Sequence, residues 1–109
     1  MNKKDRMLWQ KDAIGKLYQY ICDRKSAPPR TGSYTCSLLK SGIHRIGSKI
    51  IEESEELVEA SSDKGKKEII WEFSDLIYHM LVLLAYHDLT LNDINKELYR
   101  RHLKKQKKH

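Results

Sequence analysis

The sequence predicts an all-α fold: an antiparallel helical bundle that a second copy of the chain completes. Apolar residues recur at helical spacing in four stretches, whereas Gly and Pro number only five and two among 109 residues. So few turn residues argue against an all-β sandwich. The length suits one domain, which we expect to span residues 1–103, with a basic C-terminal tail at residues 104–109.

The N-terminal third is expected to contain one long helix and a loop. Apolar residues keep a helical period from about residue 5 to residue 23. The segment 25–33 then breaks the pattern with paired prolines and a glycine. Ser33 or Thr35 is expected to cap the next helix, because a side-chain oxygen can accept a hydrogen bond from an unpaired N–H of the first turn.

The rest of the chain is expected to form three more helical stretches. The second helix is interrupted near Gly42 and resumes over about 43–61, and the third covers about 66–87. Thr90 and Asp93 are spaced as a capping box that opens the fourth helix. The short connections between these helices favour antiparallel packing.

The third expected helix is apolar almost all round between Ile69 and Leu84. Since so short a chain cannot cover it, we expect it to lie buried at the centre of a homodimer. Its histidine, His79, lies one turn beyond Asp75 and is more typical of a satisfied core residue than of a catalytic one. No apolar run appears long enough to cross a membrane, and no apolar signal core follows the start, so we expect a cytoplasmic protein.

Two acidic pairs set into apolar helical rows are the strongest indication of chemistry. Glu53 and Glu56 form the first pair, and Glu72 and Asp75 form the second. The i, i+3 spacing places both carboxylates of a pair on one helix face. Burying such groups without partners is costly, and clustered like charges raise one another's pKa. Each pair therefore needs a compensating partner.

A hard divalent cation is the simplest partner, because it prefers oxygen ligands. We expect Glu53, Glu56, Glu72 and Asp75 to be both catalytic and metal-binding, with Mg²⁺ or alternatively Mn²⁺ as the cofactor. The other interpretation is that each acid turns to solvent or meets Lys or Arg. That would explain one pair, but two pairs in separate apolar helices favour the metal. Glu52, the next helical position, is a further catalytic candidate as ligand or water-activating base, or else plain surface charge.

Positive groups are expected to bind substrate phosphates near these acids. Arg45 and Lys49 share a helical row with Glu53, although surface pairing of Lys49 with a glutamate is the alternative. The polar segment that starts at Arg30 opens a helix, so its N–H groups and Ser33 are candidates for binding phosphate or ribose. Simple N-capping by Ser33 is compatible with that role.

The net charge of +6 is concentrated at the C-terminus, in residues 100–109. Such a tract is either a solvated tail, an attractor of anionic substrates or a non-specific RNA contact. No aromatic residues are interleaved with the basic ones and no nucleic-acid-binding motif is present, so a nucleic-acid partner is not expected.

The two acidic motifs, with fifteen residues between Glu56 and Glu72, resemble the signature of the all-α nucleoside-triphosphate pyrophosphatases, the MazG-like group. A closer resemblance, to the phosphoribosyl-ATP pyrophosphohydrolase family, rests on further segments: Gly32-Ser33-Tyr34-Thr35, Lys49-Ile50-Ile51-Glu52-Glu53, Asp75-Leu76-Ile77-Tyr78-His79 and Arg101-His102. That family often has Gly and Ala where this chain has Ile51 and Ser54.

The resemblance implies a MazG-like bundle that hydrolyses phosphoribosyl-ATP to phosphoribosyl-AMP and pyrophosphate, the second step of histidine biosynthesis. Two alternatives stay open from the sequence. One is a housekeeping pyrophosphatase of the same group that acts on dUTP, dCTP or a damaged nucleotide. The other is a non-enzymatic helical adaptor or RNA-binding protein that uses the basic tail, although this leaves the acids in the apolar rows unexplained.

Overall fold

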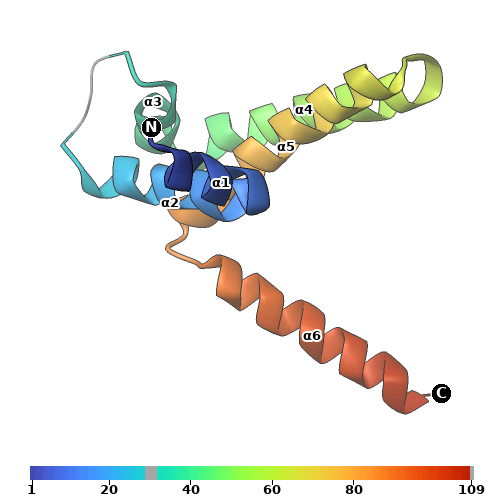
Figure 1. The fold of residues 1–109 in the computed structure, drawn as a ribbon. Coiled ribbons are helices and arrows are strands. Elements are labelled where there is room, and N and C mark those ends of the chain that lie inside the picture. Colours follow the sequence, from blue (N-terminus) through green and yellow to red (C-terminus); the bar gives the residue numbers. More distant parts are fainter. Residues whose placement is uncertain (29–31, 109) are drawn as a thin grey trace.

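The computed structural model describes residues 1–28 and 32–108, with side chains as far as residue 105. These residues form helices joined by short connections and contain no strand (Figure 1), so the predicted all-α fold is confirmed. The helices are α1 (Lys3–Lys11), α2 (Ala13–Ser26), α3 (Tyr34–Ser41), α4 (Ile43–Asp63), α5 (Lys66–Tyr86) and α6 (Leu91–Lys108).

An antiparallel hairpin of α4 and α5 extends to one side of the molecule (Figure 1). Helices α2 and α3 pack against the end of the hairpin where α4 begins and α5 ends. The buried core lies at this end and consists of Tyr18, Ile21, Leu38, Ile46, Leu81, Val82 and Ala85. The opposite end projects away from α2 and α3 (Figure 1). The chain therefore packs one end of its hairpin tightly and leaves the other with little cover.

Two helix boundaries follow from local capping, and one of them corrects the sequence prediction. The expected continuous helix over residues 5–23 is wrong, because the chain breaks at Asp12 between α1 and α2. Asp12 Oδ1 accepts a hydrogen bond of 2.9 Å from the backbone N–H of Gly15, so its side chain caps α2 rather than letting α1 continue. Ser33 caps α3 in the same way, through a 3.2 Å bond from the N–H of Cys36, as predicted.

Gly42 separates α3 from α4 at the predicted interruption. Its φ is +89° and its ψ is −169°, a conformation that is essentially restricted to glycine. The backbone N–H of Gly42 still bonds to the carbonyl of Leu38, and its own carbonyl accepts the first bond of α4 from Ile46. This one residue thus ends one helix and starts the next with a change of direction.

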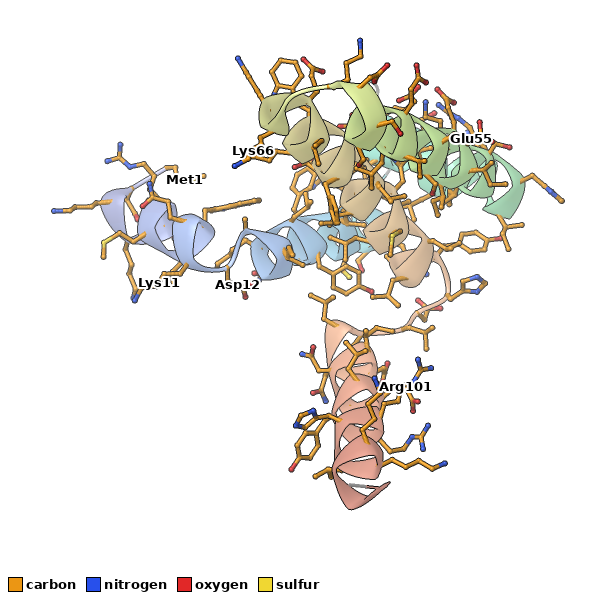
Figure 2. The ribbon with its side chains drawn as sticks, turned by 90° about the vertical axis from the view of Figure 1, so that its right-hand side faces the viewer. Met1, Lys11, Asp12, Glu55, Lys66 and Arg101 are labelled. Carbon is orange, nitrogen blue, oxygen red and sulfur yellow. The ribbon has the colours of Figure 1, made fainter. Side chains whose placement is uncertain are left out.

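Helix α6 stands apart from the hairpin, contrary to the expected antiparallel packing of the fourth helix. Figure 2 shows the labelled Arg101 of α6 well away from Glu55 of α4. The predicted capping box is confirmed, because Thr90 and Asp93 exchange backbone-to-side-chain bonds of 2.8 and 3.1 Å. The helix continues through Lys108, so the basic residues at its end are helical up to that point.

The turn that leads into α6 is tied to α2, which sets the direction of the helix. Lys25 Nζ donates to the carbonyl of Ala85 at 2.7 Å and to Asp88 Oδ1 at 2.6 Å. The Tyr18 hydroxyl donates to the carbonyl of Leu89. Asp88 itself has a positive φ of 58°, which turns the chain away from α5. The short connection was therefore a misleading guide to packing, since the turn directs α6 outward.

The apolar circumference of α5 is only partly covered within one chain. Ile70, Trp71, Phe73 and Met80 are all more than half exposed. With a mean hydropathy of 1.4 over its most apolar stretch, α5 is long and apolar enough to span a membrane by length and composition alone. The expectation that no such run exists was wrong in that narrow sense, because two acids are too few to lower the mean. Glu72 and Asp75 of α5 interact with the acids of α4, which is typical of a helix that packs within a protein.

Candidate active site

The facing sides of α4 and α5 bring the predicted acids together. Glu53 is buried, with 6% of its surface exposed, because it lies in the row of α4 that turns toward α5. Glu72 is half-buried, whereas Glu56 and Asp75 are exposed at the edge of the same contact. Each carboxylate lies close enough to at least one other to affect its ionisation. The four residues therefore form one electrostatic cluster, which we call the acidic cluster.

Two carboxyl groups of this cluster, those of Glu72 and Glu53, have raised pKa values, and the causes can be named. Burial raises the pKa of the Glu72 carboxyl above its usual value, and the adjacent Glu56 raises it further. The charges of Asp75 and Glu53 act in the same direction. Burial and the charge of Asp75 also raise the pKa of Glu53, while His79 opposes them. The negative charge of the cluster thus exceeds the positive charge beside it.

A chain of close polar contacts across three helices holds Glu53 in place. His79, which is 5% exposed, places Nδ1 against the carboxylate of Glu53 and 3.0 Å from the carbonyl of Asp75. Both partners are acceptors, so Nδ1 carries a hydrogen. The Tyr34 hydroxyl bonds to Nε2 at 2.8 Å. His79 is the satisfied core residue that the sequence favoured, yet its partner is a predicted catalytic acid.

The carboxylates are suitable ligands for a cation, although they are not arranged around a common coordination centre. Oε2 of Glu72 is buried and makes no hydrogen bond of ordinary geometry with any described group. Such an unpaired anionic oxygen is a natural ligand for a hard divalent cation. Among the described side chains, however, no three His, Cys, Asp or Glu residues are grouped as ready metal ligands. A metal site at Glu53, Glu56, Glu72 and Asp75 therefore stays a prediction.

Additional acids near the cluster were missed by the sequence analysis. A hollow of about 200 Å³ beside Glu56 and Glu72 is also lined by Glu59, Glu68 and Lys64. The signal for them was present in the helical spacing, because Glu59 follows Glu56 by three residues and Glu68 precedes Glu72 by four. These residues extend the acidic surface toward the α4–α5 turn.

The two predicted phosphate-binding cations, Lys49 and Arg45, have different partners. Lys49 Nζ lies 3.4 Å from Oε2 of Glu52, and although its partial burial acts in the opposite direction, Glu52 and Glu53 raise its pKa. Arg45 is directed toward α3 rather than toward the carboxylates. Its Nη1 donates to the hydroxyl of Ser37 at 2.6 Å and to that of Ser41 at 2.9 Å. Lys49 is therefore the predicted cation that accompanies the acids.

The remaining predicted residues lie around this arrangement. Glu52 is exposed beside Lys49 rather than inside the cluster, so its position matches the surface-charge interpretation while leaving it accessible to a substrate. Ser33 is half-buried at the start of α3, next in sequence to Tyr34. Arg30 lies outside the described residues.

The sequence profile described as phosphoribosyl-ATP pyrophosphohydrolase matches residues 14–102, from α2 to α6, and the whole acidic cluster lies within the match. The chain belongs to the phosphoribosyl-ATP pyrophosphohydrolase family. The resemblance inferred from the sequence motifs is thereby confirmed. Membership also fits the all-α fold, and it makes the departures at Ile51 and Ser54 local variations within the phosphoribosyl-ATP pyrophosphohydrolase family.

Relatives of the phosphoribosyl-ATP pyrophosphohydrolase family cover most of the chain. It is 46% identical over 93 residues to the phosphoribosyl-ATP pyrophosphatase of Clostridium acetobutylicum, which is 85% of this chain and 84% of that protein. It is 44% identical over 90 residues to the enzyme of the same name from Methanococcoides burtonii, 81% and 90% of the two proteins. A bifunctional histidine-biosynthesis protein of Caldanaerobacter subterraneus is 48% identical over 93 residues, and the chain spans 45% of its length.

Proposed function

We propose that the protein hydrolyses phosphoribosyl-ATP to phosphoribosyl-AMP and pyrophosphate, the second step of histidine biosynthesis. The observation that carries the proposal is the acidic cluster on the facing sides of α4 and α5, inside the segment matched to the family. Such a cluster suits a reaction on a polyphosphate, because the substrate itself brings the negative charge that a bound cation must neutralise. The names of the single-function relatives support the substrate.

The proposed cofactor is Mg²⁺, with Mn²⁺ as the alternative, held by Glu53, Glu56, Glu72 and Asp75. When bound, such a cation neutralises phosphate oxygens and lowers the pKa of a coordinated water. The support is the unpaired buried oxygen of Glu72 and the raised pKa values of Glu72 and Glu53. Hard oxygen donors in excess of nearby positive charge are the ligand set that these cations prefer.

The chain's own side chains have distinct roles in this proposal. Lys49 binds a non-bridging phosphate oxygen, because it is the cation beside the cluster. Glu52 is the candidate that accepts the proton of the attacking water, since it is exposed and outside the proposed ligand set. His79 and Tyr34 are positioning residues that fix the orientation of Glu53. Because each side chain has a single proposed role, substituting one residue at a time can test each role separately.

A second copy of the chain is proposed to cover the exposed seam of the hairpin. Ile70, Phe73 and Met80 of α5 lie at spacings of three and seven residues, and α4 exposes Ile51 and Val58 seven residues apart. This is the period of a helix-packing seam. A partner that buries this seam also explains the apolar surface of α5 without a membrane, so we expect a soluble dimer in the cytoplasm.

Sedimentation tests the dimer. We expect a dimer at micromolar concentration, and Phe73→Glu should shift it toward monomer because it places a charge in the seam. Tyr99→Glu is the matched control, since Tyr99 is 63% exposed on α6 and outside the seam. A wild-type protein that sediments as a folded monomer would contradict the proposal, as would equal behaviour of the two variants.

The activity is tested by measuring pyrophosphate released from phosphoribosyl-ATP, ATP, dUTP and dCTP in the presence of Mg²⁺. We expect rapid release from phosphoribosyl-ATP and little from the others. Chelation of the cation should abolish release, and added Mg²⁺ or Mn²⁺ should restore it. Release from the deoxynucleotides alone would support the proposed hydrolysis of a polyphosphate but contradict phosphoribosyl-ATP as the substrate. Release from none of them would overturn the proposed function.

A further inference from the structure

A second hollow has a different chemical character from the one beside Glu56 and Glu72. It measures about 720 Å³ and lies between the end of α2, α3 from Ser33 to Ser41, and Tyr86 at the end of α5. This volume falls within the range of small-molecule sites. The described residues that line it include no acid, and its polar side chains are cations, hydroxyls and one thiol: Arg24, Lys25, Lys40, Ser33, Ser37, Ser41, Tyr86 and Cys36. We call it the basic hollow.

We propose that the basic hollow binds the phosphorylated ribose that distinguishes phosphoribosyl-ATP from ATP. The inference rests on the proposed function and assigns one part of the substrate to a site apart from the acidic cluster. The chemistry recognised is a pentose carrying a phosphate monoester. The triphosphate end stays with the acids of α4 and α5, and the phosphorylated ribose lies with the cations of α2 and α3.

The cations of the basic hollow differ in their availability. Lys25 is occupied, because its Nζ bonds to the carbonyl of Ala85 and to Asp88. Arg24 and Lys40 have no carboxylate partner among the described residues. Nε of Arg24 is buried without a hydrogen-bond acceptor, while its guanidinium carbon lies 5.9 Å from the ring centre of Tyr20. A buried donor that lacks an acceptor is costly, and a phosphate oxygen would satisfy it.

The hydroxyl groups and the start of α3 add to this preference for an anion. Ser33 and Ser37 line the basic hollow on successive turns of α3. Ser33 caps α3, so its hydroxyl accepts from the N–H of Cys36 while its own hydrogen can bond to a ligand. The positive end of the α3 dipole lies beside Ser33, whereas the C-terminal ends of α2 and α5 also line the hollow. The cationic side chains and the hydroxyl donors are therefore what favours one anionic group here.

A continuous line of contacts joins the basic hollow to the acidic cluster. Ser33 lines the basic hollow, and the next residue, Tyr34, bonds to His79, which contacts Glu53. The Arg45 guanidinium carbon lies 5.7 Å from the ring centre of Tyr34. A single substrate that passes Tyr34 can therefore reach both places. Deoxynucleoside triphosphates have no phosphorylated ribose attached to the base and therefore cannot use the basic hollow.

The test compares ligands that differ only at this end, using the full-length protein and calorimetry. Wild type should bind phosphoribosyl-AMP about tenfold more tightly than AMP, or more. The Arg24→Gln/Lys40→Ala double variant should lose that difference while its affinities for AMP and pyrophosphate stay unchanged. The matched control is Arg6→Gln/Lys96→Ala, which removes the same charge from exposed positions outside the hollow. Arg24→Lys retains the charge and guards against a folding defect, together with the melting temperature of each variant.

Two kinds of failure are distinguishable. If wild type cleaves phosphoribosyl-ATP but the double variant binds phosphoribosyl-AMP as wild type does, the basic hollow is not the subsite. The same conclusion follows if the double variant loses affinity for phosphoribosyl-AMP, AMP and pyrophosphate equally. If wild type does not cleave phosphoribosyl-ATP, the proposed function fails, and ribose 5-phosphate against ribose tests the basic hollow directly. Equal binding of those two sugars would then overturn it.

Discussion

Replacing Glu72 by Gln should make the cation-free protein more stable at neutral pH while weakening its response to Mg²⁺. The Glu72 carboxyl has a raised pKa because of its burial and the adjacent Glu56. A raised folded-state pKa means that the folded protein binds the proton more tightly than the unfolded chain does. Stability is therefore greatest below the unfolded value and falls as pH rises through the folded one. Gln keeps the shape and removes the charge, so this fall should shrink.

Other acids do not obscure the effect above pH 5. The two arginines beside Glu97 lower its pKa to about 2, and backbone bonding lowers that of Asp93. Their contributions to stability are already complete above the ordinary carboxylate range. The part of any decline between pH 5 and pH 8 that Glu72→Gln removes reports the Glu72 carboxyl, because the histidines, which change charge in the same range, are common to both proteins.

The size of the Mg²⁺ response follows from linkage. A cation present at a hundred times its dissociation constant stabilises the folded protein by about 2.7 kcal/mol. For a chain of this length that corresponds to a melting-temperature rise on the order of 10 °C. Losing one of four carboxylate ligands should weaken binding about tenfold, which leaves about 1.4 kcal/mol at the same concentration. The shift in the Glu72→Gln protein should be roughly half that of wild type.

Thermal melts followed by circular dichroism from pH 5 to pH 8, with EDTA or with Mg²⁺, measure both quantities. Glu55→Gln is the matched control, because Glu55 is exposed on α4 (Figure 2) and makes the same change in charge. The reasoning fails if cation-free wild type is equally stable across this range. It also fails if the Glu55 and Glu72 variants respond alike.

Four further substitutions separate chemistry, substrate binding, positioning and backbone geometry. Asp75→Asn should leave the melting temperature nearly unchanged while pyrophosphate release collapses, and full activity of this variant would contradict the proposed mechanism. Lys49→Ala should mainly raise KM. Tyr34→Phe removes the hydroxyl bonded to His79, and Mn²⁺ titration followed by electron paramagnetic resonance should show about 10–100-fold weaker binding; unchanged affinity would make the bond purely structural. Gly42→Ala should lower the free energy of unfolding by about 1–3 kcal/mol, because φ there is +89°, and a urea midpoint equal to wild type would disprove that strain.

The sequence was a good guide wherever a local chemical signal decided the structure. Gly42 and the Thr90–Asp93 box marked helix ends correctly, because a positive φ and a reciprocal cap depend on neighbouring residues alone. The acidic pairs were also informative, since i, i+3 spacing determines a helix face whatever packs against it. These features required no knowledge of the rest of the chain.

Features that depend on tertiary contacts were harder to infer. The Asp12 break was hidden because apolar spacing continues across it, and only the bond to the Gly15 N–H reveals the cap. The outward course of α6 depends on Lys25, which lies about sixty residues earlier in the chain. Arg45 shares a helical row with Glu53, but the hydroxyls on α3 provide nearer partners. The link from Tyr34 to Glu53 likewise appears only when three helices are assembled.

The one-sided core has a consequence for how the empty enzyme moves. The hairpin is held firmly where Ile46 and Val82 are buried, whereas the turn near Gly65 lies beyond the cover of α2 and α3. The acidic cluster lies between these two ends, so amide hydrogens on its turn side should exchange through local opening, and those beside the core only through global unfolding. Local opening of the α4–α5 turn can therefore relieve the repulsion among the carboxylates while the rest of the fold stays folded. A bound cation and a partner chain would both damp that motion, so occupancy of the site and assembly would be coupled through the flexibility of one turn.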